Sequence, residues 1–263
     1  VQRMVIMSKP VIIALVGKGG VGKTSISALT IRILMEKYPN KKILAIDADP
    51  AIGLATALNV SVSSTVDDIR KLFVSSVEDG KTDSAIKMLS EAKYRLVDSL
   101  VEMDNLSFLA IGRPEAAGCY CKVNAYLKEV IGMIASNYDF IVIDGEAGIE
   151  QINRRVMDTV SHLILVSDGS KKGLEVVKTI YDVSLKLVSF KHYGLIVNRI
   201  IDPSYINSID TKGLNTLAYI LDDRSMTESD MLGHSIFELD SNSIIYTKTK
   251  EALEKLFSEG GLE

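Results

Sequence analysis

Hydrophobic positions along the chain form two alternating kinds of pattern. Short runs that are apolar throughout are typical of parallel strands covered by helices on both faces. Such runs occupy 11–16, 42–47, 106–111, 140–144, 162–167 and 194–198, with a weaker one at 218–221. Segments with helical periodicity separate them, at 25–38, 124–137, 173–190 and 241–257. The alternation predicts an α/β fold, a doubly wound and mostly parallel sheet with helices on both faces.

The segment 66–103 departs from this rhythm because it is charged and largely helical in pattern, without a strand. We expect it to form an added helical excursion. No linker, repeat or low-complexity tract interrupts the chain, so we expect residues 1–263 to form a single domain. Residues 1–8 contain two candidate start residues, Met4 and Met7, and are expected to be disordered or foreign to the native chain.

Charge and hydropathy exclude several classes of protein. The formal net charge is -4, with acidic and basic residues interspersed, so the sequence does not indicate a nucleic-acid partner. The apolar runs are shorter than the ~20 residues that a membrane-spanning helix needs. The N-terminus lacks the apolar core of a signal peptide. We therefore expect a cytoplasmic protein without a membrane partner.

A phosphate-binding loop follows the first apolar run and leads into the first helical segment. It comprises Gly17, Lys18, Gly19, Gly20, Val21, Gly22, Lys23, Thr24 and Ser25. The glycines leave backbone N–H groups free to surround an anion. Lys23 is placed to reach the β- and γ-phosphates of a nucleotide, and the Thr24 hydroxyl to ligate Mg²⁺.

Lys18 is not required for this loop to bind phosphate. A cation at this position would neutralise negative charge that the loop itself leaves uncompensated. The alternative is a solvated lysine on the surface of the loop.

Two predicted strands end in aspartates. Asp47 and Asp49 have the spacing that places side chains on one face of a strand, directed toward the phosphate loop. Asp144 ends another strand and is followed four residues later by Gly148. This pattern is typical of the second nucleotide motif, in which the aspartate holds Mg²⁺ through water and the glycine senses the γ-phosphate. Thr24, Asp47 and Asp144 are therefore the predicted Mg²⁺ residues, acting directly or through water.

The chain contains two cysteines, Cys119 and Cys121. Two cysteines placed at random would be this close on the order of one time in a hundred. A cytoplasmic setting and the strain of so short a bridge disfavour a disulfide, which leaves buried inert thiols or a metal site. A tetrahedral soft-metal site takes about four ligands, and a two-fold dimer would supply the missing pair.

Taken together, the phosphate loop and the aspartate motifs resemble the deviant P-loop ATPases that include MinD, ParA and the nitrogenase iron protein. The resemblance implies an ATP-controlled homodimer in which Lys18 reaches the phosphates of the partner's nucleotide. It further implies that Asp49 orients the attacking water beside Lys23, and that Asn198, next to Arg199, reads adenine. ATP, ADP and Mg²⁺ are the implied cofactors.

A second resemblance concerns the cysteine segment. Gly-Arg-Pro-Glu at 112–115 and Gly-Cys-Tyr-Cys at 118–121 are similar to the signature of the CooC family of nickel-insertion ATPases. This similarity implies delivery of Ni²⁺ to a client enzyme, either carbon monoxide dehydrogenase or acetyl-CoA synthase. It also implies that Cys119 and Cys121 bind Ni²⁺ or Zn²⁺ across the homodimer. Gly145 and Glu146 depart from the wider class, where many members carry proline.

Two other functions are compatible with these motifs. Four thiolates across a dimer would also hold a 4Fe–4S cluster in an ATP-dependent electron-transfer protein. The close spacing of the cysteines argues mildly against this alternative. A positioning ATPase of the ParA or MinD kind is the other, and it leaves the cysteine pair unexplained.

Overall fold

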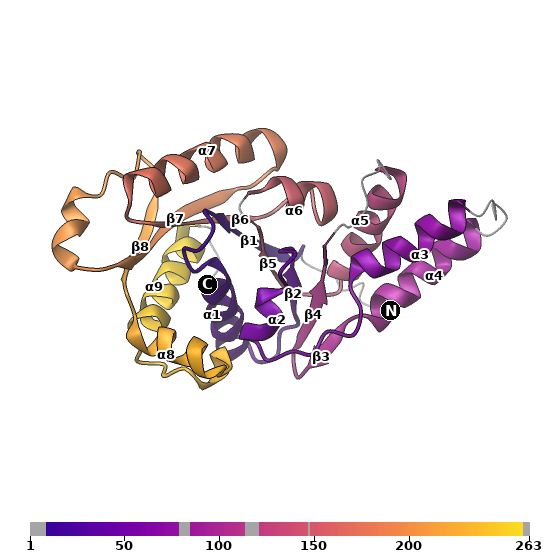
Figure 1. Ribbon diagram of the computed structural model, residues 1–263, viewed down its shortest axis with the longest axis horizontal. Coiled ribbons are helices and arrows are strands. Elements are labelled where there is room, and N and C mark those ends of the chain that lie inside the picture. The colour runs from indigo at the N-terminus through magenta and orange to yellow at the C-terminus, as the bar shows by residue number, and fades with distance from the viewer. Residues whose placement is uncertain (1–8, 79–84, 114–120, 147, 260–263) are drawn as a thin grey trace, which may run out of the picture.

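The computed structural model describes residues 9–78, 85–113, 121–146 and 148–259. In this part of the chain the strands form one eight-stranded sheet with the order β3-β4-β2-β5-β1-β6-β7-β8 (Figure 1). The strands are β1 (Val11–Gly17), β2 (Ile43–Asp47), β3 (Val101–Met103), β4 (Leu106–Ala110), β5 (Phe140–Asp144), β6 (His162–Asp168), β7 (His192–Ile200) and β8 (Thr216–Leu221). All neighbouring strands run parallel except β3 and β4.

Helices cover both faces of this sheet. They are α1 (Lys23–Lys37), α2 (Gly53–Ala57), α3 (Val66–Glu78), α4 (Ala85–Asp98), α5 (Cys121–Ala135), α6 (Glu150–Arg155), α7 (Lys171–Leu187), α8 (Arg224–Leu232) and α9 (Ile244–Glu259). Short 3₁₀ segments occur at Pro203–Ser208 and Ile236–Glu238. The predicted doubly wound fold is thus confirmed, and every predicted strand and helix is present with its ends shifted by a few residues.

Alternate residues of the buried strands face opposite helical layers. In β1, Ile13 and Leu15 pack with α1 and α9 on one face. Ala14 and Val16 pack with α5, α6 and α7 on the other. Figure 1 shows the two layers, with α7 and α6 on one side of the sheet and α1 and α9 on the opposite side. Burial of both faces explains why these strands are apolar throughout.

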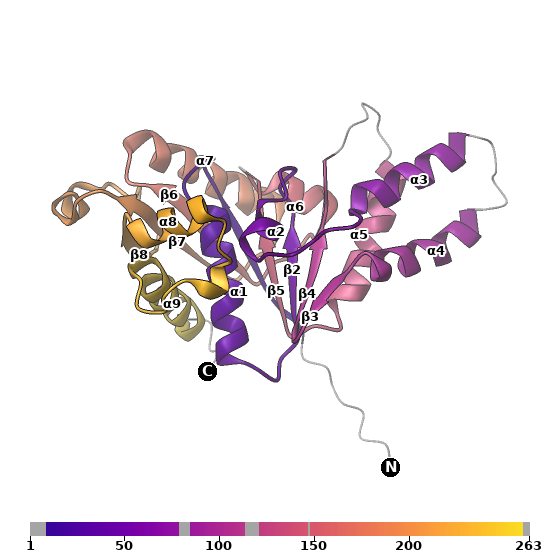
Figure 2. The ribbon, with the colours of Figure 1, turned by 60° about the horizontal axis from the view of Figure 1, so that its bottom comes forward.

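The expected excursion at 66–103 is a helical hairpin, α3 and α4, that packs against α5 and projects beyond the sheet (Figure 2). The prediction that this segment holds no strand was wrong. Val101–Met103 forms β3, which pairs antiparallel with β4 after a turn at Asp104 and Asn105. Three residues at a sheet edge are too few to show an alternating pattern.

Several short helices were not predicted, because a segment of five to nine residues spans too few turns for its periodicity to be recognised. Within the described ranges, no helix has the length and apolar content that crossing a membrane requires.

Candidate functional site

The carboxyl ends of the central strands meet at one edge of the sheet, and most predicted site residues lie there. Asp47 of β2 and Asp144 of β5 are paired in register. Gly17 of β1 pairs with Val166 of β6, and Asp168 of β6 pairs with Asn198 of β7. Residues from the first and last thirds of the chain therefore converge on the loop between β1 and α1.

Close packing requires glycine at two positions of this loop. A Cβ on Gly17 would lie 2.0 Å from the Val166 carbonyl oxygen. Gly22 has a φ of 88°, and a Cβ there would lie 2.6 Å from Asn198 Nδ2. Gly19, by contrast, has open space where a Cβ would be. The loop is thus held tightly at both ends and left open in the middle, as an anion-binding loop needs.

Lys23 lies at the start of α1, beneath the loop. Its Nζ donates to the Lys18 carbonyl oxygen at 3.1 Å, and the residue is buried. Burial lowers the pKa of the Lys23 ammonium, while the nearby Asp144, Asp49 and Glu146 act in the opposite direction. A buried cation at the end of a glycine-rich loop is suited to hold phosphate oxygens.

Asp144 accepts two hydroxyl hydrogen bonds from α1. Thr24 Oγ1 donates to its Oδ2 at 2.8 Å, and Ser27 Oγ donates to its Oδ1 at 2.8 Å. Burial raises the pKa of Asp144 to about 6, although the two hydroxyls and Lys23 oppose this shift. Thr24 and Asp144 together present hard oxygen ligands of the kind that Mg²⁺ prefers. Ser27 was not predicted, since a serine one turn into a helix carries no sequence signal of its own.

Asp47 and Asp49 do not share one strand face, contrary to the expectation from their spacing. β2 ends at Asp47, so the alternation of a strand does not extend to Asp49, which lies in the following turn. The Asp47 carboxylate accepts the backbone N–H groups of Asp49 at 3.1 Å and Leu54 at 2.9 Å. The pKa of Asp47 is raised to about 7, chiefly by burial of the carboxyl group and secondly by the negative charge of the nearby Asp144. Bound Mg²⁺ would favour the charged forms of the Asp47 and Asp144 carboxylates, so these residues fit the ion.

The raised pKa of Asp144 predicts a stability effect that depends on pH. Its pKa rises from 3.8 to about 6, so the folded chain keeps a proton that the unfolded chain releases. The contribution of this group to stability therefore falls as pH rises through that window. We expect Asp144→Asn to stabilise the nucleotide-free, Mg²⁺-free protein by about 1–3 kcal/mol at about pH 8, and the gain to disappear near pH 4.

Chemical denaturation of both proteins at several pH values, in the presence of a chelator, measures this difference. The asparagine side chain fits at this position because the Thr24 and Ser27 hydroxyls either donate or accept. Asp182→Asn, at an exposed carboxylate paired with Lys178, is the control and should show no such gain at high pH. An Asp144→Asn difference that does not change with pH would contradict the prediction.

Lys18 forms an ion pair within its own chain. Its Nζ lies 2.8 Å from Asp168 Oδ2, and the two side chains are 31% and 29% exposed. Asp168 also accepts the Ser170 N–H at 3.1 Å, at the start of α7. Burial would raise the pKa of Asp168, but the hydrogen bonds from Lys18 and Ser170 outweigh it and lower the pKa. Lys18 is thus held near the surface, apart from the buried Lys23.

Asn198 and Arg199 attach the end of β7 to the phosphate loop. Asn198 Nδ2 donates to the Val21 carbonyl oxygen at 2.9 Å, and Arg199 Nη1 donates to the Gly20 carbonyl oxygen at 2.7 Å. A small cavity opens beside them. Its lining combines the phosphate loop, α1 and β7 with the two residues after β8, α8 and α9: Gly22, Ser25, Asn198, Arg199, Asp222, Asp223, Met226, Thr227, Asp230 and Ile245.

The part of this cavity formed by Asp222, Asp223 and α8 was not predicted. Asp222 and Asp223 directly follow the predicted strand 218–221, so they stand at the carboxyl edge where ligands bind in such sheets. Their position directly after a predicted strand was the sequence signal that could have identified them as site residues.

Of the predicted metal residues, Cys119 lies outside the described residues. Only the main chain of Cys121, the first residue of α5, is described.

Gly148 precedes α6, and a Cβ on it would lie 2.3 Å from Glu150 Oε2. The structure therefore assembles the predicted phosphate and Mg²⁺ residues, and the placement of the thiols stays a prediction.

Comparison with known proteins agrees with this geometry. A family model described as an AAA domain matches residues 9–191. An uncharacterized ATP-binding protein of Methanocaldococcus jannaschii is 36% identical over 253 residues, which cover 94% of this chain and 99% of that protein. The carbon monoxide dehydrogenase accessory protein CooC of Rhodospirillum rubrum is 26% identical over 208 residues, covering 71% and 78% of the two chains.

The fold is similar to that of the septum site-determining protein MinD of Pyrococcus horikoshii, solved with Mg-ADP. The TM-score is 0.66 at 22% identity, and the match covers 96% of this chain and 98% of MinD. The chain therefore belongs to the AAA domain family and has a MinD-like P-loop fold.

Proposed function

We propose that this protein is an ATP-dependent nickel chaperone that matures the nickel site of carbon monoxide dehydrogenase or acetyl-CoA synthase. In this proposal ATP closes a homodimer around a metal site formed by Cys119 and Cys121 of both chains. Support comes from the cysteine segment, the nucleotide site and the similarity to a protein named as a carbon monoxide dehydrogenase accessory protein.

The nucleotide half of the proposal uses the loop and the two buried aspartates. Lys23 and the loop N–H groups bind the phosphates of ATP, and Thr24, Asp47 and Asp144 hold Mg²⁺. When bound, the ion would supply positive charge against the charge that develops on the phosphates during hydrolysis. Asp49, in the turn after β2, positions the attacking water.

The base and the γ-phosphate are assigned to neighbouring elements. Asn198 and Arg199 border the cavity that would take adenine, where Asp222 and Asp223 add hydrogen-bond acceptors. Gly148, after β5, would sense whether the γ-phosphate is present. Hydrolysis to ADP would then release this part of the chain.

Dimerisation depends on Lys18. In the single chain its ammonium is paired with Asp168 at the surface of the site. A second copy would present nucleotide phosphates to this ammonium, with more negative charge than one carboxylate offers. Lys18 would then exchange Asp168 for the phosphates of the partner's nucleotide.

The observation that carries the proposal is a direct main-chain link between the nucleotide site and the cysteine segment. The Ile111 N–H donates to the Asp47 carbonyl oxygen at 2.8 Å. The cysteine segment follows Ile111 in the sequence, and α5 begins at Cys121, the last residue of that segment. A shift of Asp47 on nucleotide exchange would therefore move the base of the metal-binding segment.

Metal binding tests the proposal. We expect the dimer to bind Ni²⁺ or Zn²⁺ at one ion per two chains, and the Cys119→Ser, Cys121→Ser double variant to lose that ion entirely, because serine hydroxyls replace soft thiolates. Metal analysis and Ni²⁺ titration, each with ADP and with ATP, measure this. ATP affinity should not change.

Lys23→Ala is the reciprocal control. This variant should lose ATP binding, while both cysteine thiols are still present. Stoichiometric metal in the serine variant would refute the site. A brown, iron-containing dimer after anaerobic purification would instead support the electron-transfer alternative.

A further inference from the structure

The end of β7 holds the phosphate loop by its main chain. Arg199 Nη1 donates to the Gly20 carbonyl oxygen at 2.7 Å. Asn198 Nδ2 donates to the Val21 carbonyl oxygen at 2.9 Å. Asn198 is only 3% exposed, so its bond is shielded from water. Two consecutive residues of one strand thus fix two consecutive carbonyl groups of the loop.

These bonds also fix the direction of two N–H groups. A trans peptide unit is planar, so its C=O and the N–H of the next residue point in opposite directions. Because the Gly20 and Val21 carbonyls are turned toward β7, the N–H groups of Val21 and Gly22 are turned away from it. Across the described ranges, neither of these N–H groups donates a hydrogen bond to the protein. Unpaired N–H groups of successive loop residues are suited to bind an anion.

The fit between β7 and the loop is close, and it includes an uncommon backbone conformation. Arg199 has a φ of 57°, in the left-handed region that residues with a Cβ rarely occupy. Residues of this kind concentrate at functional sites, where the surrounding structure holds them in place. On the loop side, a Cβ on Gly22 would lie 2.6 Å from Asn198 Nδ2. The contact therefore leaves little freedom to either partner.

We propose that Asn198 and Arg199 form a clamp that holds the Val21 and Gly22 N–H groups in the direction needed to bind the phosphates of the nucleotide. Both act as positioning residues, through the main chain of the loop. The clamp is formed before a nucleotide arrives, so phosphate binding does not have to order this part of the loop. The inference rests on the nucleotide half of the proposed function and is independent of the nickel half.

Pyrophosphate and adenosine represent the two ends of the nucleotide and test the clamp. Pyrophosphate with Mg²⁺ should occupy only the loop, and adenosine only the base cavity. Arg199→Met should lower the affinity for pyrophosphate by about fivefold, the effect of one net hydrogen bond, and leave that for adenosine within about twofold. Calorimetric or NMR titration measures both affinities. Loss of adenosine affinity alone, or equal loss for the two probes, would overturn the proposal.

Asn198→Leu separates the orientation of the loop from the charge of Arg199. Leucine is close to asparagine in shape but cannot donate a hydrogen bond, and the change leaves the net charge unaltered. Pyrophosphate affinity should fall here by a similar factor. If only Arg199→Met weakens pyrophosphate binding, the guanidinium acts as a charge and the clamp is refuted.

A spectroscopic measurement replaces this variant if Asn198→Leu does not fold. In nucleotide-free Arg199→Met, the amide resonances of Val21 and Gly22 should broaden, because their peptide units are released from β7. Line widths equal to those of the wild type would refute the clamp.

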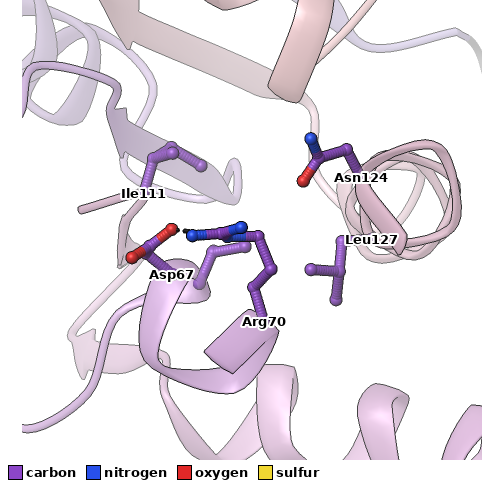
Figure 3. Close-up of a pocket in the computed structure, with 6 residues that line it drawn as sticks. Asp67, Arg70, Ile111, Asn124 and Leu127 are labelled. Atoms are coloured by element: carbon purple, nitrogen blue, oxygen red, sulfur yellow. Dashed lines mark hydrogen bonds and ion pairs between the residues drawn. The ribbon is translucent and has the colours of Figure 1, made fainter. Parts of the chain in front are cut away.

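Arg95→Met is the control for the loss of a positive charge. Arg95 is an exposed residue of α4, on the hairpin that projects away from the sheet (Figure 2), and its variant should bind pyrophosphate like the wild type. Arg70 of α3 is unsuitable. Its Nε donates to Asp67 Oδ1 at 2.7 Å (Figure 3), so its removal would leave a buried carboxylate without its cation. A wild-type protein that binds no pyrophosphate would overturn the nucleotide half of the proposed function, and the clamp with it.

Discussion

Replacing Lys18 with alanine is expected to abolish ATP-dependent dimerisation and to reduce ATP hydrolysis by about a hundredfold or more, while ATP affinity changes only a few-fold. Lys18 does not lie beneath the phosphate loop; its Nζ is paired with Asp168, 2.8 Å away. Lys23 and the loop N–H groups would therefore still bind the nucleotide. A cation supplied across an interface to phosphates in the transition state contributes effects of this size.

Sedimentation with ATP and ADP, nucleotide titration and steady-state hydrolysis measure the three quantities separately. Lys212→Ala is the matched control, because Lys212 forms a comparable ion pair with Asp210 at 2.7 Å on an exposed loop. If Lys18→Ala dimerises and hydrolyses ATP like the wild type, Lys18 is a surface lysine paired with Asp168 and nothing more.

A second large effect is expected for Gly17→Ala, on stability. A Cβ at this position would lie 2.0 Å from the Val166 carbonyl oxygen and 2.9 Å from its carbon. Gly17 and Val166 are paired in the β1–β6 register, so relief of the clash requires two central strands to separate. We expect a loss of at least about 3 kcal/mol, with the melting temperature lowered by about 6 °C or more.

Gly19→Ala makes the same chemical change in the same loop and is the control. Nothing lies within 4 Å of a Cβ there, so its stability should stay within about 1 kcal/mol of the wild type. Denaturation without nucleotide compares the two variants, which keeps any effect on phosphate binding out of the result. Equal stability of the two variants would show that β1 and β6 can move apart at little cost.

The parts of the site that could be predicted are those carried by consecutive residues. The phosphate loop and the aspartates at strand ends follow from a contiguous motif and from the rule that ligands bind at carboxyl ends of parallel strands. The short runs of apolar residues likewise predicted the sheet, because burial on both faces leaves little room for polar residues.

What could not be predicted depends on contacts between distant residues. Asp168 is 150 residues from Lys18, and no local pattern marks it as the partner of that lysine. In the sequence, Asp67 and Arg70 resemble an ordinary pair on one turn of a charged helix, and only the packing of α3 against α5 buries them. The cavity beside Asn198 also needed the position of α8, which is too short to be recognised from periodicity.

The attachment of the cysteine segment to the sheet has a consequence for how such proteins diversify. Ile111 is joined to Asp47 through its N–H and to Asp67, at 2.9 Å, through its carbonyl oxygen. Both bonds belong to the main chain, which every residue other than proline can provide. The sequence that follows can therefore be replaced as a whole without loosening its anchor. One scaffold could thus carry different segments at this position during evolution while its nucleotide site stays unaltered.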